Sequence, residues 1–451
     1  MKCWICLIVL VSGLMTTSLK SQNFNRPVPP GYLHPYEFKQ YDTTDYGYYL
    51  TTPFTTYKFP VDSALTRGLL LDKDGFIVWF WTKSEPGMIY DFQYHPQNKM
   101  FSCFCPNYFL LLDSSFKINH YFDNYEGLRI DMHEFQILRN GNAAFFMFRD
   151  TLIKIPAWAK DSVIGSDSAK IKNFYIIEFD NENNLIFNWN LLKNVPIEMT
   201  YAKWRNILPF DYAHPNAISE DSDGNLLVSF CNLNAVYKID HKTGKVLWRL
   251  GGKKSSFVFT NDNGFSAQHD IRCLADGTYS LYDNTDCATQ ETRALIYSLD
   301  TLKWTATKVW EYRSTPEFYA PIAGNHQVTD NHNHLINYGF ERRPYPTMDF
   351  IDNNCKKISQ IFFADSVKSY RSYIYKLPFT LPRPKIIGNN YKDSIVLTAP
   401  SGYQRYLWST GGTSESITVK KAGVYQVWVN YGIGMLGSKP FFYNKSPKTK
   451  K

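Results

Sequence analysis

The sequence predicts an all-β chain, namely a six-bladed β-propeller followed by a small β-sandwich. Three observations lead to this prediction. Tyr, Phe and Trp make up 17% of the 451 residues, and these residue types favour strands. A hairpin pattern occurs six times between residues 69 and 363. Beyond a proline-rich stretch, residues 391–429 alternate between apolar and polar side chains around Gly-rich turns, which is typical of short strands.

Each copy of the hairpin pattern consists of an apolar strand, an Asp, a short polar turn and a second strand with aromatic residues. The turn aspartates are Asp72, Asp113, Asp180, Asp240, Asp300 and Asp352. Asp favours tight turns because its side chain accepts hydrogen bonds from the backbone that follows. Copies spaced roughly 40–70 residues apart are typical of four-stranded blades. Six copies therefore predict six blades, and a seventh would require a hidden copy.

A second pattern lies between the hairpins and contains the candidate catalytic residues. It begins at His133, His214, Gln268 and Asn325. Equivalent positions in successive blades surround the axis of a propeller, and the residue that opens an inner strand lies at the mouth of the central channel. We therefore expect His133, His214 and His269 to face one another, with Asn325 at the corresponding position of a fourth blade.

A lone histidine in a strand is usually a hydrogen-bonded structural residue. Three histidines at equivalent positions of a repeat are different, because a scaffold has no reason to place imidazoles at the same point of several blades. Glu134 and Asp270 directly follow two of them. Since successive side chains of a strand point to opposite faces, we expect these carboxylates to point away from the histidines.

A group of neutral imidazoles permits two kinds of chemistry. Histidine is a common ligand of divalent transition metals, so a metal-dependent lyase or hydrolase is one hypothesis. The other is nucleophilic catalysis on an anionic ester, in which one imidazole attacks and the others donate hydrogen bonds to the departing oxygen. Nucleophilic attack needs no metal and no nucleotide, and we expect no cofactor.

Several segments resemble the bacterial PAPS-independent arylsulfate sulfotransferases, which are periplasmic propeller enzymes. They are DYAHPNAI with DGNLLVSF, VYKIDHKTGKVLWRLGGK and QHDIRCLADGTYSLYDN, and the resemblance extends from about Tyr48 to Phe363. The resemblance implies that His269 is the nucleophile and becomes sulfated, and that His214 and Asn216 assist transfer and hold sulfate. His133 maps onto the remaining catalytic histidine. The expected partners are small phenolic sulfates as donors and phenols as acceptors.

One departure from the family pattern concerns Cys231, which occupies the position of an arginine that would grip the sulfuryl oxygens. Arg249, Arg272 or Arg293 would have to replace it. If none does, the alternative is a noncatalytic secreted propeller that binds a glycan or a protein. Asn325, at the fourth repeat position, is the further residue that we expect to contact substrate.

The ends of the chain carry signals of export and of an added module. Residues 1–21 have a basic start and a short apolar run, as in a secretory signal peptide, which places the protein in the periplasm or at the cell surface. We expect an N-terminal extension at 22–47, the propeller at 48–375, a β-sandwich at 385–444 and a basic tail at 445–451. The YLWSTG and AGVYQV segments of the sandwich resemble immunoglobulin-like modules of secreted bacterial enzymes.

The bulk composition narrows the possible partners. The net charge of +8 arises in part from the C-terminal lysines, so it does not indicate a nucleic-acid partner. No apolar run approaches the length of about 18 residues needed to span a bilayer. A homodimer is compatible with the sequence.

Overall fold

The computed structural model describes residues 26–42, 47–55, 68–81, 89–162, 167–204, 209–285 and 291–444. Strands are the main secondary structure of these residues, with α1 (Leu191–Asn194) as their single α-helix, and the all-β prediction is confirmed. No helix in the described ranges is long and apolar enough to cross a membrane. The predicted signal peptide, 1–21, and the basic tail, 445–451, lie outside the described residues.

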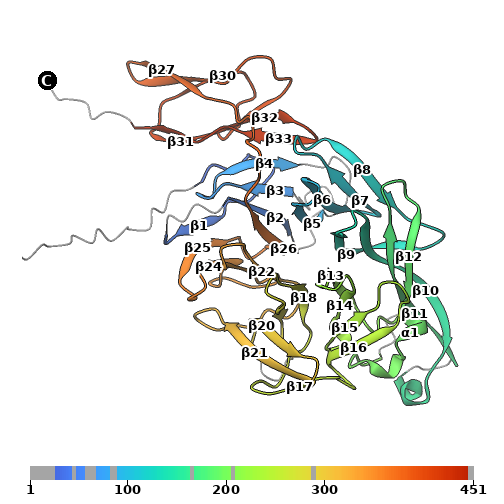
Figure 1. The fold of residues 1–451 in the computed structure, drawn as a ribbon. Helices are drawn as coiled ribbons and strands as arrows, with labels where there is room; N and C mark the ends of the chain where they lie inside the picture. The colour runs from blue at the N-terminus through green and yellow to red at the C-terminus, as the bar shows by residue number, and fades with distance from the viewer. Residues whose placement is uncertain are drawn as a thin grey trace, which may run out of the picture.

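Six innermost strands surround a common axis (Figure 1). They are β26 (Val367–Tyr375), β5 (Tyr90–His95), β9 (Arg129–Ile137), β13 (Pro215–Glu220), β18 (His269–Cys273) and β22 (Asn325–Val328). Each contacts the next in this order, and β22 contacts β26 again. The ring of inner strands is therefore closed, as in a β-propeller.

Each innermost strand begins a meander of four antiparallel strands. The outer strands are β2 (Tyr48–Thr55), β3 (Gly68–Leu71), β4 (Ile77–Trp81), β6 (Met100–Cys105), β7 (Tyr108–Leu112), β8 (Ile118–Asp123), β10 (Ala143–Lys154), β11 (Ser168–Phe179), β12 (Leu185–Asn190), β14 (Leu226–Phe230), β15 (Ala235–Ile239), β16 (Val246–Gly251), β19 (Tyr279–Asp283), β20 (Arg293–Asp300), β21 (Thr305–Tyr312), β23 (His334–Asn337), β24 (Met348–Ile351) and β25 (Lys357–Phe362). In the first unit the chain order differs, because β26 comes from the far end of the propeller and pairs antiparallel with β2.

The turn aspartates act as the repeat predicts. In every one of the six, Oδ1 accepts hydrogen bonds from two backbone N–H groups further along the turn. For Asp72 the two donors are Asp74 and Phe76, at 3.2 and 2.8 Å. These bonds satisfy backbone groups that a tight turn leaves without a strand partner.

Two short strands extend the outer edges of the propeller. β1 (Glu37–Gln40) lies in the predicted N-terminal extension and pairs antiparallel with β25. β17 (Val258–Phe259) pairs parallel with β21. The extension is thus built into one sheet rather than separate from it.

The C-terminal part consists of eight short strands. β27 (Ile387–Tyr391), β28 (Ser394–Thr398) and β30 (Ser416–Val419) form one sheet, and β31 (Gly423–Tyr425) pairs with β34 (Phe441–Tyr443). β29 (Tyr406–Trp408), β32 (Val427–Tyr431) and β33 (Gly434–Gly437) continue the first propeller sheet, because Met435 and Leu436 of β33 pair with Phe80 and Trp79 of β4. Sequence analysis did not foresee this continuous sheet. The immunoglobulin-like assignment and the boundaries at 375, 385 and 444 stay predictions.

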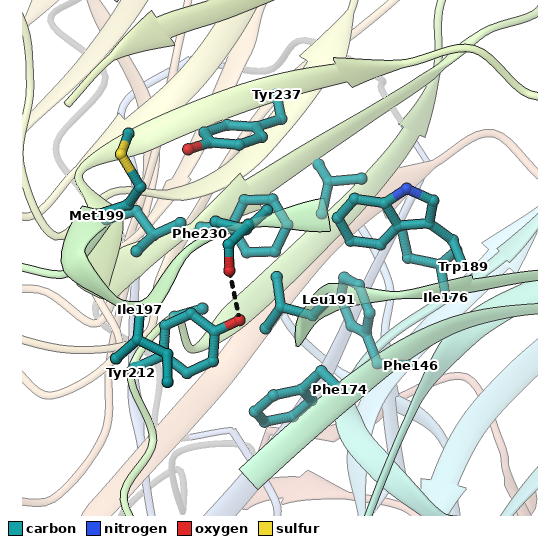
Figure 2. Packing of buried hydrophobic residues seen from close by; sticks show 14 of the residues in the cluster. Phe146, Phe174, Ile176, Trp189, Leu191, Ile197, Met199, Tyr212, Phe230 and Tyr237 are labelled. Carbon is teal, nitrogen blue, oxygen red and sulfur yellow. Dashed lines mark hydrogen bonds between the residues drawn. The ribbon is translucent and has the colours of Figure 1, made fainter. Parts of the chain in front are cut away.

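A large apolar cluster fixes the units that carry two of the histidines. Phe146, Ile176 and Trp189 of the β9–β12 unit pack with Phe230 and Tyr237 of the β13–β16 unit (Figure 2). Burying each such side chain contributes about 1.5–3 kcal/mol. The Tyr212 hydroxyl, which lies inside the cluster, donates to the Val195 carbonyl at 3.0 Å. This packing holds β9 and β13 against each other.

Candidate active site

The ring of inner strands brings His133, His214 and His269 together. His269 opens β18, and His214 directly precedes β13. His133 is the fifth residue of β9, so the expectation that it would open its strand is wrong. The strand begins earlier because its pairing with β10 resumes beyond an irregularity, where Ile130 pairs with Met147 and Arg129 with Phe148.

His133 and His214 form a pair of perpendicular rings. Their centroids lie 4.7 Å apart, at an interplanar angle of 78°. His133 Nδ1 lies 2.5 Å from Asp131 Oδ1, and His214 Nδ1 lies 2.8 Å from Asp211 Oδ2. Each carboxylate also accepts the backbone N–H of its own histidine. Both rings are therefore oriented through Nδ1 by an aspartate, which leaves Nε2 of each ring available for proton transfer or substrate contact.

The pKa of His214 is raised above its ordinary value. Burial lowers the pKa of this imidazole, but the charge of Asp211, the hydrogen bond to it and the charge of Asp131 together outweigh burial. The pKa of Asp211 is lowered in turn, because His214 outweighs the effect of burial on that carboxyl. His214 is accordingly the imidazole suited to carry a proton.

His269 has different partners. Its Nδ1 lies 2.8 Å from Asn284 Oδ1 and 3.1 Å from the Ala267 carbonyl oxygen. Asn284 Nδ2 donates to the carbonyls of Ala320 and Ala323, both at 2.9 Å, so the amide cannot be turned around. Since both neighbours of Nδ1 are acceptors, Nδ1 carries the hydrogen and Nε2 carries the lone pair.

Burial lowers the pKa of His269 to about 3, with further lowering from the charges of His214, His133 and Arg371. The hydrogen bond to Asn284 opposes this shift but does not overcome it. His269 is 3% exposed. At neutral pH it is an uncharged imidazole with a free Nε2 lone pair, which is the form that a nucleophile requires.

A comparison with protein families identifies the family of this part of the chain. The model of the arylsulfotransferase (ASST) family matches residues 119–343, a range that contains all three histidines. This part of the chain belongs to the arylsulfotransferase family. The match supports a function of the arylsulfotransferase type, with small phenolic molecules as substrates. A search of curated proteins found no match.

Solved structures resemble the chain only remotely. A protein of unknown function from Bacteroides caccae is 11% identical, with a TM-score of 0.46 over 73% of this chain and 99% of that one. A catalytically inactive virginiamycin B lyase from Staphylococcus aureus with Quinupristin is 12% identical, with a TM-score of 0.36 over 81% and 98%. The WD40 domain of Neurospora crassa Pan2 is 10% identical, with a TM-score of 0.35 over 91% and 99%.

Asn216 and Asn325 lie on the same ring but differ in what their amides contact. Asn325 uses both ends of its amide on the backbone of Ser372, donating at 2.8 Å and accepting at 2.9 Å. Asn216 Nδ2 donates to the Gln268 carbonyl at 2.8 Å, while its buried Oδ1 has no partner in the described part of the chain. Asn325 thus ties β22 to β26, and Asn216 keeps one amide atom open.

Cys231, at the position of the family arginine, lies beside His214, and its backbone N–H donates to the His214 carbonyl at 3.0 Å. Burial raises the pKa of the Cys231 thiol to about 12, and Asp211 adds to this effect. The side chain is therefore uncharged at neutral pH and offers no grip for an anion.

Each of the three arginines considered as replacements for the family arginine at position 231 is engaged by other residues. Arg249 stacks over Tyr237, Arg272 pairs with Glu134 and Asp270, and Arg293 pairs with Asp262 and Asp283. The structure shows another cation nearby, Lys172, whose charge acts on both Asp211 and His214. It lies on β11 of the neighbouring unit, where the repeat gave no hint of it.

An ion network fills the axis beside the histidines. Arg371, which is fully buried, lies 3.1 Å from Glu134 and 3.4 Å from Asp91 and donates to the Asn216 carbonyl. Arg272 lies 2.9 Å from Glu134 and 2.6 Å from Asp270. Glu134 and Asp270 therefore bind arginines rather than the histidines. Burial raises the pKa of Asp91 to about 7, against the opposing charge of Arg371.

Sequence analysis missed the residues that orient the imidazoles. Asp131 and Asp211 precede their histidines by two and three residues, a spacing that could have drawn notice. Asn284 is fifteen residues from His269 and becomes its neighbour only through the β18–β19 hairpin. No group of three or more His, Cys, Asp and Glu side chains in the described ranges is arranged to hold a metal ion.

Proposed function

We propose that this protein moves a sulfuryl group from a phenolic sulfate ester to a phenol through a sulfated His269. The observation that carries the proposal is the difference between the imidazoles. His269 is neutral and bound to an amide, whereas His133 and His214 are bound to carboxylates. One nucleophile and two proton carriers are the groups that such an exchange requires.

In the first step, His269 Nε2 attacks the sulfur of the donor. A nitrogen–sulfur bond forms while the bond between sulfur and the phenolic oxygen breaks. His214, whose pKa is raised, donates its Nε2 proton to the departing phenolate. A neutral nucleophile suits this step, because the sulfate ester already carries a negative charge and repels anions.

In the second step, the hydroxyl oxygen of the acceptor phenol attacks the same sulfur. The nitrogen–sulfur bond breaks, His269 regains its lone pair and the acceptor proton passes to the imidazole pair. Asp131 and Asp211 stabilise the positive charge that the pair then carries. The cycle needs neither a metal nor a nucleotide.

The sulfuryl oxygens need hydrogen-bond donors, and Cys231 supplies no charge for them. We assign this role to His214, whose ring packs against that of His133, and to Lys172 as a further cation whose charge acts on His214. Asn325 then acts as a positioning residue, since both ends of its amide bind the backbone of β26, whereas Asn216 keeps Oδ1 open for the substrate. We further propose that the mature protein works in the periplasm or at the cell surface.

The test measures transfer from a chromogenic aryl sulfate to a phenol acceptor. Wild type releases coloured phenol in the presence of acceptor, and His269→Ala abolishes the release. His332→Ala, at an exposed histidine outside the ring, serves as the matched control and keeps full activity. Equal turnover by wild type and His269→Ala would overturn the proposal. Binding of ligand without any release by wild type would favour the noncatalytic alternative.

A further inference from the structure

A surface groove on the outer edge of the propeller has a charge that the proposed reaction does not use. It lies between β12 and the turn that joins β15 to β16, and its volume is about 570 Å³. Arg149, Lys193 and Lys242 line it, and no acidic residue does. We call it the basic groove. The lining extends across β11 and β10 of the same sheet through Tyr175 and Arg149, but includes no residue of the histidine-bearing strand β9.

The cations of the basic groove form no direct ion pair within the described part of the chain, although the charge of Lys242 acts on Asp240. None of the ion pairs found there involves Arg149, Lys193 or Lys242. Arg149 is also held in place, because its Nε donates to the Tyr175 hydroxyl at 2.9 Å and its guanidinium stacks over the Tyr175 ring. That hydrogen bond uses Nε and leaves the outer edge of the guanidinium for an oxyanion.

The groove also contains neutral groups. Phe187 lines it with a half-buried ring, and the amide of Asn188 is exposed in its wall. An aromatic ring packs against the apolar face of a sugar, and amides exchange hydrogen bonds with hydroxyl groups. The combination of cations, amides and an aromatic ring favours a ligand that carries both anions and hydroxyls.

The charge becomes mainly acidic on the other side of Ile186 and Phe187. The cavity there, of about 470 Å³, is lined by Glu178, Asp223 and Asp240 together with His241 and Lys242, so Lys242 stands between the two cavities. An anionic chain is therefore attracted to one side of this ridge and repelled from the other, which restricts it to one path. A uniformly basic surface would give no such restriction.

We propose that the basic groove binds an anionic polysaccharide, whose anions are sulfate esters or uronate carboxylates. Such binding would hold the enzyme on a polymer while the histidines remain free. The site is separate from the proposed sulfuryl transfer, so either can fail without the other.

The test uses affinity electrophoresis of the full chain in gels that contain dextran sulfate, polygalacturonate, polyglutamate or neutral dextran. The groove variant combines Arg149→Gln, Lys193→Gln and Lys242→Gln. The matched control combines Lys303→Gln, Lys392→Gln and Lys420→Gln, which remove the same charge from exposed positions elsewhere. We expect the groove variant to bind about ten-fold more weakly and the control to match wild type.

Retardation of wild type by dextran sulfate alone identifies sulfate esters as the anion, and retardation by polygalacturonate as well extends the ligand to uronates. Equal weakening of the control variant would overturn the proposal, because net charge would then explain the binding. So would equal retardation by neutral dextran, no retardation in any gel, or tighter binding to polyglutamate than to either glycan. The groove variant should unfold at the same urea concentration as wild type, which shows that it is folded whether or not the protein transfers sulfuryl groups.

Discussion

Nδ1 of His269 lies 2.8 Å from Oδ1 of Asn284, in a site where the other two imidazoles are bound to carboxylates. An amide oxygen orients the ring as a carboxylate would, but it lends no negative charge to stabilise an imidazolium. The buried His269 consequently stays neutral, with a pKa lowered to about 3. The identity of one hydrogen-bond partner thus separates the nucleophile from the proton carriers.

Asn284→Asp should convert His269 into a third carboxylate-bound imidazole. The added charge raises the pKa of His269, so a larger fraction is protonated near neutral pH and cannot attack sulfur. We expect kcat/KM to fall at least about ten-fold at pH 6 and to recover as the pH rises. The measurement is the pH profile of transfer, in which wild type shows no such acid limb. A variant profile parallel to that of wild type would refute the role of Asn284.

Asp211→Asn should move the alkaline limb of the profile. Protonated His214 is required as the acid, so activity falls as the pH rises through its raised pKa. Removing the charge of Asp211 lowers that pKa and shifts the decline to lower pH. Asp276→Asn, in an exposed turn, is the control and should leave the limb in place. An unshifted limb in Asp211→Asn would mean that His214 is not the acid.

Arg371→Met should lower the free energy of unfolding by about 3–5 kcal/mol, because it leaves Asp91 buried without a cation and removes one of the two arginines that pair with the buried Glu134. The control is Arg343→Met, which removes an exposed ion pair with Glu37 and should cost about 0–1 kcal/mol. Urea denaturation at neutral pH measures both. Similar losses in the two variants would contradict the importance of the axial network.

Buried neutral histidines should make the fold acid-sensitive. Burial lowers the pKa of His95 to about 4, whereas the unfolded chain binds a proton below about pH 6.5. Between these values the unfolded state holds more protons, so stability falls as the pH falls, by about 1.4 kcal/mol per pH unit for each such group.

His95→Gln removes one of these groups and retains a hydrogen-bonding partner for Ser102. The free energy of unfolding is measured for both proteins at pH 7 and pH 5.5. Wild type should lose more of it on acidification than the variant does. Equal losses on acidification in the two proteins would show that His95 does not contribute.

The repeat in the sequence predicted the features that occupy equivalent positions in successive units. The turn aspartates and the meeting of His133, His214 and His269 follow from equivalent positions in successive units, and the sequence contains those positions directly. The residues that bind the histidines through Nδ1 do not occupy repeat positions. Asp131 lies inside β9 where the pairing with β10 is irregular, and Asp211 lies in the segment before β13. Asn284 reaches His269 only when β19 folds back on β18.

Other features required knowledge of which strands close the ring. Arg371 enters the axis because β26 completes the first unit, more than 300 residues from its partner β2. The repeat could not show this, because β26 carries no copy of the histidine pattern. The pairing of β33 with β4 is equally hidden, since it joins edges whose sequences contain no sign of their partner.

The central claim is that His269 carries the sulfuryl group between donor and acceptor. Brief exposure to an aryl sulfate without acceptor, followed by proteolysis under alkaline conditions and mass spectrometry, tests it most directly. We predict one added sulfuryl group on the peptide that contains His269, which disappears when a phenol is supplied. An unmodified His269 peptide under conditions of turnover, or a sulfuryl group on another residue, would contradict the account.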